Sequence, residues 1–302
     1  MLLKDIINKG VETVSMRYPQ GEAKEMVFAY IEDVFGFKRH AHILNPELQL
    51  SEESASASLA DFMRMAAGEP LQYVTGKAYF YGREYKVTPS VLIPRQETEI
   101  LCMEAVQAVS SFTGGCHSDF RVLDLCTGSG CIAWTMALEM PGLKVKAVDI
   151  SEAALKVASS QEFSEEMAAT GACSPVFLKE DVLLGPDNST LSEEKYDVIV
   201  SNPPYVMESE KAQMRANVLE HEPHLALFVP DEDPLKFYRA VASWAASLLS
   251  EKGVGIVEIN EALGNETAEV FKKAGFDKLE IIRDLHEKER FVKFSHMDFV
   301  SK

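Results

Sequence analysis

A tetrapeptide in the last third of the chain has the residue types needed to hold a planar amino group. It reads Asn202-Pro203-Pro204-Tyr205 and follows an apolar run, residues 196–201, that predicts a buried strand. Prolines donate no backbone N–H, so the carbonyls of Asn202 and Pro203 lack the partners of a continuing strand. The Asn202 amide adds an acceptor oxygen, and Tyr205 adds an aromatic wall. The pattern favours a site that grips an –NH2 group, although two prolines can also simply end a strand.

A glycine-rich segment, residues 124–133, joins a predicted strand over 121–126 to a predicted helix over 129–139. Gly128 and Gly130 permit a tight turn and the close approach of a ligand. N–H groups at the start of the helix can bind a carboxylate or a phosphate. With Ala133 the spacing satisfies the dinucleotide fingerprint. By itself it does not separate a nicotinamide cofactor from S-adenosylmethionine, since both carry a ribose diol.

Three acidic residues at predicted strand ends favour S-adenosylmethionine. Asp124 would repel a pyrophosphate but attract an amino-acid ammonium group. Asp149 is placed to accept both ribose hydroxyls, and Asp181 to accept from an adenine amino group, although Asp181 could instead cap a turn. We therefore predict S-adenosylmethionine as cofactor, with S-adenosylhomocysteine as its product. The predicted cofactor-binding residues are Asp124, Cys126, Thr127, Gly128, Ser129, Gly130, Asp149, Ile150, Asp181, Val182 and Asn202.

The remaining pattern indicates how these residues are positioned. Residues 1–75 have helical periodicity and predict a small N-terminal helical bundle without visible chemistry, which is either a packing module or an N-terminal helical substrate-docking domain. The aromatic alternation over 76–92 predicts a β-hairpin linker. From 93 to 302, strands and helices alternate, which predicts an α/β domain with a Rossmann-like, mostly parallel seven-stranded sheet. We expect strands over 121–126, 145–149, 175–179, 197–201, 253–259, 278–283 and 290–295, and helices over 97–109, 129–139, 152–169, 234–250 and 262–274. Residues 206–233 form a long irregular stretch, which is often functional.

Composition limits the binding partners and the cellular compartment that we expect. The 302 residues carry a formal net charge of −17, most of it beyond residue 85, which argues against stable nucleic-acid binding. The five cysteines form no C-x-x-C pair, and an odd count without a signal peptide suggests a reducing compartment. No 18-residue apolar span is present, so we expect a cytoplasmic protein without membrane association. The pair His221-x-x-His224 is interrupted by a proline and has no cysteine nearby, so we expect no metal.

Several sequence blocks together resemble one enzyme family across nearly the whole chain. The blocks are Gly68-Glu69-Pro70-Leu71-Gln72-Tyr73-x-x-Gly76, Val91-Leu92-Ile93-Pro94-Arg95-Gln96-Glu97-Thr98-Glu99, the glycine segment, Asn202-Pro203-Pro204-Tyr205, Glu222-Pro223-x-x-Ala226-Leu227 and Asp233-Pro234-Leu235-x-Phe237-Tyr238. In combination they resemble the release-factor glutamine methyltransferases (the HemK/PrmC family). The chain departs from the family pattern at Cys126 and Asn260, where glycine is usual.

The resemblance implies a class I S-adenosylmethionine-dependent methyltransferase. Its implied substrate is the glutamine side-chain amide in the Gly-Gly-Gln motif of class 1 peptide chain release factors, so that methylation modulates translation termination. We expect Asn202, Pro203 and Tyr205 to be catalytic, and these with Pro204 to bind substrate. The Asn202 side-chain oxygen and the Pro203 carbonyl would accept both amide hydrogens, which favours pyramidalisation of the nitrogen.

Other readings stay open from the residues alone. An amino methyltransferase acting on adenine or guanine in DNA or RNA would suit the same tetrapeptide, but usually carries a basic face. A nicotinamide oxidoreductase would not explain the tetrapeptide. A non-catalytic cofactor-binding protein would not explain why the tetrapeptide occurs together with the acidic residues at the strand ends. Arg95, Glu97 and Glu99 could line the cofactor pocket or fix the hairpin. We expect residues 1–75 and 206–233 to grip the release factor.

Overall fold

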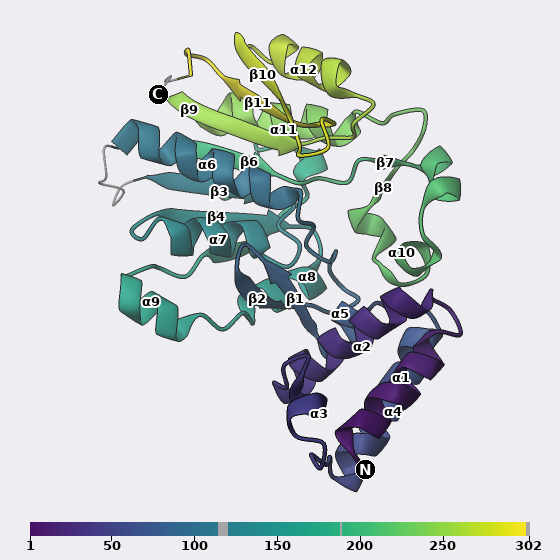
Figure 1. Ribbon diagram of the computed structural model, residues 1–302. Coiled ribbons are helices and arrows are strands. Elements are labelled where there is room, and N and C mark those ends of the chain that lie inside the picture. Colours follow the sequence, from purple (N-terminus) through teal and green to yellow (C-terminus); the bar gives the residue numbers. More distant parts are fainter. Residues whose placement is uncertain (114–119, 188, 300–302) are drawn as a thin grey trace. The chain divides into compact units, whose positions relative to one another are not determined.

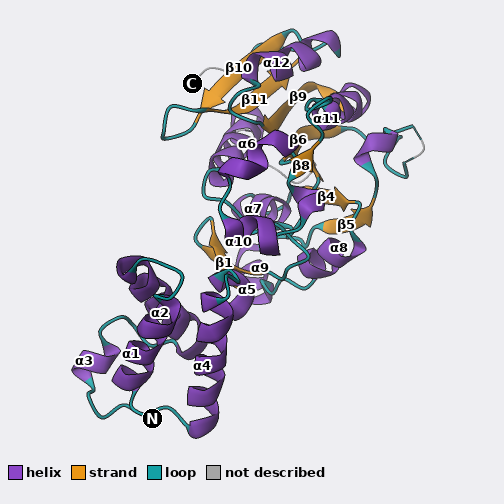
Figure 2. Ribbon diagram, turned by 90° about the vertical axis from the view of Figure 1, so that its right-hand side faces the viewer, coloured by secondary structure: helices purple, strands orange, loops and turns teal. Residues whose placement is uncertain are grey.

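The computed structural model describes residues 1–113, 120–187 and 189–299, and the chain divides into two compact units. The helical unit comprises Met1–Ala78, Val87–Pro89 and Met214–Glu222, and the sheet unit comprises Tyr79–Lys86, Ser90–Gln213 and Pro223–Lys302. The stretch expected to be irregular, 206–233, therefore contributes to both units. In Figure 2 the N-terminal segment is drawn as helices, and the strands begin later in the chain.

The helical unit has its own apolar core. Its helices are α1 (Leu3–Val14), α2 (Gln20–Phe35), α3 (Ala41–Leu44), α4 (Glu52–Ala66), α5 (Leu71–Thr75) and α10 (Ala216–His221). The Ser51 side chain caps α4 by accepting from the Ser54 N–H at 3.0 Å. Tyr30 and Phe62 are buried at the centre with their rings in edge-to-face contact. The helix periodicity seen in residues 1–75 thus corresponds to side chains that bury one another.

A seven-stranded sheet organises the second unit, and its spatial order is β10-β11-β9-β6-β3-β4-β5 (Figure 1). The strands are β3 (Arg121–Leu125), β4 (Lys144–Asp149), β5 (Val176–Lys179), β6 (Tyr196–Ser201), β9 (Leu249–Glu258), β10 (Lys278–Arg283) and β11 (Glu289–Ser295). The pairings from β9 to β5 are parallel, whereas β11 runs antiparallel to both of its neighbours. The predicted α/β class, with a mostly parallel seven-stranded sheet, is confirmed.

Helices cover both faces of this sheet (Figure 1). On one face α6 (Thr98–Thr113) and α7 (Cys131–Glu139) contribute to one apolar cluster, and on the other α11 (Lys236–Leu248) and α12 (Gly264–Lys273) contribute to a second. Strand side chains alternate between faces. In β3, Val122 joins the α6–α7 cluster, whereas Leu123 and Leu125 join the α11–α12 cluster. The carboxyl group of Asp124 therefore lies on the α6–α7 side.

One expected helix proved to be two. The pattern over 152–169 predicted a single helix, but α8 (Glu152–Ser159) ends before α9 (Ser164–Thr170) begins. The intervening Gln161 is buried, and its side chain exchanges two hydrogen bonds with the Lys86 backbone and donates to the Ser129 carbonyl at 3.1 Å. These long-range bonds hold Gln161 outside a helix, which local periodicity does not reveal.

The expected hairpin is present as β1 (Lys77–Phe80) and β2 (Arg83–Lys86). Its turn has Tyr81 at φ 50° and Gly82 at φ 74°, the two positive values that a tight hairpin turn requires. Arg83 anchors the hairpin by ion pairs to Glu139 and Glu166. None of the described helices combines the length and hydrophobicity that crossing a membrane requires.

The segment expected to be irregular contains short regular elements. They are β7 (Val206–Met207), a 3-10 helix over Glu208–Gln213, α10, a 3-10 helix over His224–Ala226 and β8 (Phe228–Val229). Strands β7 and β8 pair in parallel. The structure therefore corrects the prediction of a long irregular stretch, because its elements are only two to six residues long and too short to produce a sequence pattern.

Candidate active site

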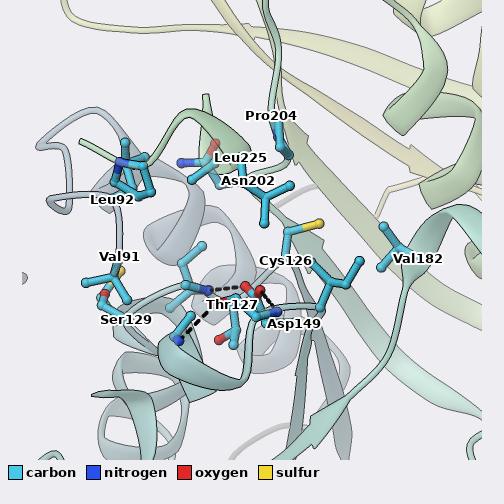
Figure 3. A pocket seen from close by; sticks show the side chains of 18 of the residues that line it. Val91, Leu92, Cys126, Thr127, Ser129, Asp149, Val182, Asn202, Pro204 and Leu225 are labelled. Carbon is cyan, nitrogen blue, oxygen red and sulfur yellow. Dashed lines mark hydrogen bonds between the residues drawn. The ribbon is translucent and has the colours of Figure 1, made fainter. Parts of the chain in front are cut away.

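A pocket of about 1090 Å³, including its opening to solvent, lies at the carboxyl ends of the parallel strands (Figure 3). All of its lining residues belong to the sheet unit. They come from the segments after β3, β4, β5 and β6 and from the segment that leads into α6. The 3-10 helix over His224–Ala226 with the preceding Pro223, and the start of α11, complete the lining. The predicted site residues among them are Cys126, Thr127, Gly128, Ser129, Asp149, Ile150, Asp181, Val182, Asn202 and Pro204. Sequence positions far apart are thus brought to one cavity.

The order of the strands explains this position. From β3 the chain proceeds through β4 and β5 towards one edge, and β6 then returns to the opposite side of β3. Loops that leave adjacent strands in opposite directions open a crevice between them, where open α/β sheets bind ligands. The ends of β3 and β6 are tied together because the Ser201 hydroxyl donates to the Leu125 carbonyl at 2.7 Å. This bond sets the tetrapeptide beside the glycine segment.

Hydrogen bonds from backbone N–H groups of the glycine segment hold it in place. The Thr127 N–H donates to the Val148 carbonyl at 2.9 Å, and the Gly128 N–H donates to Asp149 Oδ2 at 2.9 Å. Gly130 has φ 80°, and a Cβ there would lie 2.9 Å from the Ala158 Cβ. Glycine is therefore required at 130 both by the backbone angle and by the close approach of α8.

Cys126 adopts a backbone conformation that suits glycine. Its φ is +64°, in the left-handed region that L-residues occupy at a cost of about 1–2 kcal/mol. It also lines the pocket, between Asn202 on one side and Asp149 on the other in Figure 3. Burial raises the pKa of the Cys126 thiol well above its usual value, so this sulfur stays protonated. The departure from the family's usual glycine therefore strains the loop and adds a small apolar group to the pocket.

Asp149 and Asp181 both reach the pocket. The two Asp149 oxygens accept from the Gly128 N–H and from the Ser151 N–H, each at 2.9 Å. Burial raises the pKa of Asp149, and these two N–H groups oppose that effect. Asp181 caps the 3-10 helix over Val182–Leu184 by accepting from the Leu183 N–H at 2.9 Å. The capping role considered for Asp181 is therefore real, and it coexists with a position in the pocket wall.

Asp124 lies beneath the pocket, outside its lining. It is fully buried, and its Oδ2 accepts from the Thr127 hydroxyl at 2.6 Å. Its Oδ1 has no hydrogen-bond partner in the described part of the chain. Burial raises the pKa of Asp124 to about 7, and the hydrogen bond from Thr127 opposes that effect. Gly130 is likewise absent from the lining residues, because it packs against α8.

The tetrapeptide presents only part of itself to the pocket. Asn202 and Pro204 line it, whereas Pro203 and Tyr205 do not. The Tyr205 ring packs against the α11–α12 cluster, and its hydroxyl donates to Glu258 Oε1 at 2.9 Å. The expected aromatic wall at Tyr205 therefore differs from the observed arrangement, in which the ring turns towards the sheet because a buried carboxylate accepts its hydroxyl.

Two residues beside the tetrapeptide were not predicted from the sequence. Glu258, at the end of β9, is buried, and its Oε2 accepts from the Thr98 hydroxyl at 2.7 Å. Thr98, at the start of α6, in turn accepts from Asn202 Nδ2 at 3.2 Å. Burial raises the pKa of Glu258, and the hydrogen bonds from Thr98 and Tyr205 oppose that effect. The available signals were the acidic residue at a strand end and the place of Thr98 inside the block 91–99.

Comparison with known proteins identifies the family. Residues 6–76 match the family model of the PrmC N-terminal domain, and residues 109–225 match that of the methyltransferase small domain. A release factor glutamine methyltransferase of Flavobacterium psychrophilum is 34% identical over 97% of this chain and 99% of its own. One of Bacteroides thetaiotaomicron is 38% identical over 91% of this chain and 93% of its own. The chain belongs to the release factor glutamine methyltransferases. The predicted family is confirmed.

A solved structure supports the fold independently. The catalytic domain of hMettl16 aligns with a TM-score of 0.52 over 84% of this chain and 85% of its own, at 14% identity. At that identity the likeness shows the shared methyltransferase fold alone.

The family-specific block at 91–99 serves both the pocket and the hairpin. Arg95 lines the pocket, together with Val91, Leu92 and Thr98. Glu99 instead accepts from the Tyr81 N–H at 2.8 Å, which fixes the hairpin turn. Both roles considered for this block are therefore present, in different residues.

The described cysteines are unpaired, and no described cluster is suited to a metal. Cys102, Cys126, Cys131 and Cys173 are free thiols, and Cys116 lies outside the described residues. Burial raises the pKa of the Cys131 thiol to about 12, as expected of a packed apolar side chain. Within the ranges described, no group of three or more His, Cys, Asp or Glu side chains could hold a metal ion.

Proposed function

We propose that this protein methylates the side-chain amide nitrogen of the glutamine in the Gly-Gly-Gln motif of class 1 peptide chain release factors. One observation carries the proposal: family membership spans almost the whole chain. The position of Asn202 in the lining of the pocket, together with the glycine segment, supports it. Release factors act with ribosomes, so the proposal also implies a cytoplasmic protein.

The residues of the pocket fit S-adenosylmethionine, which supplies the methyl group when bound and leaves as S-adenosylhomocysteine. Asp149 would accept from the ribose hydroxyls, since each of its oxygens keeps a lone pair beyond the N–H that it accepts. Ile150 and Val182 offer apolar contact for a purine, and Asp181 offers an acceptor for its amino group. Asp124, with its unpartnered oxygen under the loop, suits a nearby ammonium group and disfavours a pyrophosphate.

Asn202 would hold the substrate amide. An amide nitrogen is a poor nucleophile because its lone pair is delocalised into the carbonyl group. The Asn202 side-chain oxygen and the Pro203 carbonyl would accept its two hydrogens and favour a pyramidal nitrogen whose lone pair faces the donor. Catalysis then comes from orientation and from preorganised acceptors. The alkylated nitrogen is strongly acidic and releases one of its two hydrogens as a proton, so no separate general base is needed before transfer.

The test is transfer of a labelled methyl group. The full chain is incubated with methyl-labelled S-adenosylmethionine and an intact class 1 release factor, and the modified residue is located by mass spectrometry. A matched release factor whose motif glutamine is changed to alanine serves as the control. Label on the motif glutamine and none on the control supports the proposal, whereas unlabelled wild-type factor contradicts it.

A parallel reaction tests the rival substrate class. DNA and RNA replace the release factor, and label on an adenine or guanine amino group would indicate a nucleobase methyltransferase. The net charge of −17 weighs against this outcome, since nucleic-acid binding depends on cationic side chains.

Residues 1–75 and 206–233 are proposed to grip the release factor. The helical unit has a separate core, and its α10 lies within the second of these segments. Deletion of residues 1–75 should impair methylation of the intact factor more than it weakens cofactor binding. Equal loss of both would instead indicate that these residues are needed for folding.

A further inference from the structure

We propose that Thr98 and Glu258 are positioning residues that keep the oxygen of the Asn202 amide, and not its nitrogen, turned towards the substrate. This inference rests on the proposed function and extends it to residues outside the tetrapeptide. It gives Thr98, in the block 91–99, a role in the reaction.

The three side chains form a chain of hydrogen bonds. Asn202 Nδ2 donates to Thr98 Oγ1 at 3.2 Å, and Thr98 Oγ1 donates to Glu258 Oε2 at 2.7 Å. Thr98 and Glu258 are 2% and 1% exposed, so water does not compete for these bonds. No other hydrogen bond of the Asn202 side chain forms within the described residues. Its Oδ1 is therefore the group left for a ligand.

The donor and acceptor roles in these hydrogen bonds follow from the chemistry of Glu258. Burial raises the pKa of Glu258, but the hydroxyls that donate to both of its oxygens favour the ionised form, and an ionised carboxylate accepts hydrogen bonds and donates none. Both of its oxygens are engaged, by the hydroxyls of Thr98 and of Tyr205. The Thr98 hydrogen is therefore committed to Glu258, and its oxygen can only accept from Asn202. An acceptor at that position selects the Nδ2 end of the amide, and the opposite end is the oxygen.

Without this constraint the Asn202 side-chain amide can flip, which exchanges the positions of its oxygen and its nitrogen. The two ends of an asparagine amide have nearly the same shape but opposite hydrogen-bonding character. A Thr98 hydroxyl released from Glu258 could donate to the Asn202 oxygen and so hold the reversed orientation. The reversed amide presents N–H groups to the –NH2 group of the substrate, and two donors cannot pair. The network thus excludes an unproductive rotamer of almost equal shape.

Tyr205 closes the network onto the same tetrapeptide. Its hydroxyl donates to Glu258 Oε1 at 2.9 Å, so Asn202 and Tyr205 both depend on this carboxylate. The strand β9 that carries Glu258 pairs directly with β6, which leads into the tetrapeptide. Glu258 therefore holds both ends of the motif from a neighbouring strand of the sheet.

The first test separates positioning from folding by kinetics. Thr98→Val keeps the shape of the side chain and removes its hydroxyl, and we expect kcat for an intact release factor to fall about 10- to 30-fold. KM for S-adenosylmethionine should stay within about threefold, and Thr98→Ser should restore kcat to within about threefold of the wild type. Thr135→Val is the matched control, because Thr135 is also buried and shares a hydrogen bond with a tyrosine, Tyr85, outside the pocket lining.

The second test observes the Asn202 side-chain amide by NMR and requires no methyl transfer. Asparagine-selective 15N labelling reports on seven side-chain amides, and that of Asn202 is the signal lost in Asn202→Ala. We expect Thr98→Val and Glu258→Gln to shift the Asn202 Nδ2 signals, and Thr135→Val to leave them unchanged. An unshifted Asn202 signal in Thr98→Val would overturn the inference.

A double-mutant cycle tests whether Glu258 acts through Thr98. Glu258→Gln should lower kcat in the wild-type background, but by no more than about threefold further in the Thr98→Val background. Fully multiplicative effects would overturn this arrangement, as would wild-type kcat in Thr98→Val. A wild-type chain that methylates no release factor would overturn the proposed function alone, because the amide signals require no substrate.

Discussion

The Asn260 side chain donates to the backbone carbonyl of Tyr205 at 3.2 Å and so supports the tetrapeptide from its C-terminal end. Its Nδ2 also donates to Glu210 Oε2 at 2.8 Å, and its Oδ1 accepts from the Ala262 N–H at 2.9 Å. Glycine, the usual family residue here, could make none of these bonds. The departure at Asn260 thus links the segment after the tetrapeptide to the end of β9.

Replacement of Asn260 should loosen that segment. Asn260→Ala removes the side-chain donor to the half-buried Tyr205 carbonyl and one of the two N–H donors to Glu210 Oε2, so we expect the free energy of unfolding to fall by about 1–3 kcal/mol. Limited proteolysis within residues 206–213 should become faster. Asn265→Ala, at an exposed position on α12, is the control and should change neither quantity. Unchanged proteolysis in Asn260→Ala would show that the segment is held by other contacts.

Cys126→Gly should be tolerated or mildly stabilising. The φ of +64° costs an L-residue about 1–2 kcal/mol, which glycine would avoid. Glycine loses more conformational entropy on folding, which offsets about 0.5–1 kcal/mol of this gain in stability. Cys126→Val should destabilise by more, because a β-branched residue fits this region poorly. Urea unfolding of both variants measures the difference. Equal stability of the valine and glycine variants would argue against backbone strain at this position.

Asp124 should make stability depend on pH. Burial raises its pKa from the ordinary 3.8 to about 7, so between these values the folded chain keeps a proton that the unfolded chain releases. Stability is therefore lost as the pH rises through this window, by up to roughly 4 kcal/mol, at about 1.4 kcal/mol per pKa unit.

Asp124→Asn isolates this effect because the amide does not titrate. Without ligand, the free energy of unfolding of the wild type should fall relative to that of the variant as the pH rises from about 4 to about 7. Urea unfolding across that range measures the difference, and a difference independent of pH would contradict the prediction.

Asn202→Ala should abolish most of the activity without preventing cofactor binding. It removes a preorganised acceptor, so we expect kcat to fall at least about 100-fold. S-adenosylmethionine affinity, measured by calorimetry, should stay within a few fold, since Asp149 and the glycine segment remain. Near-normal turnover of this variant would eliminate the assigned role of Asn202.

The architecture was predictable because its signals are local. Apolar runs between helix-length segments gave all seven strands of the main sheet to within a few residues, and strand ends located Asp149, Asp181 and Asn202. Such patterns follow from burial on one or both faces of an element, which depends on residues near in sequence. The break at Gln161 was missed because distant backbone groups cause it.

The sequence alone determined the family, the seven-stranded α/β fold and the segments that meet at the pocket. Residue types and their spacing suffice for these, because strand ends collect at one edge of a parallel sheet. Only the tertiary structure decided that Tyr205 turns away from the pocket and that Asp124 lies beneath it. It also brought Thr98 and Glu258, 160 positions apart, to the Asn202 amide. Side-chain direction depends on buried partners from other strands and helices, and sequence spacing carries no record of them.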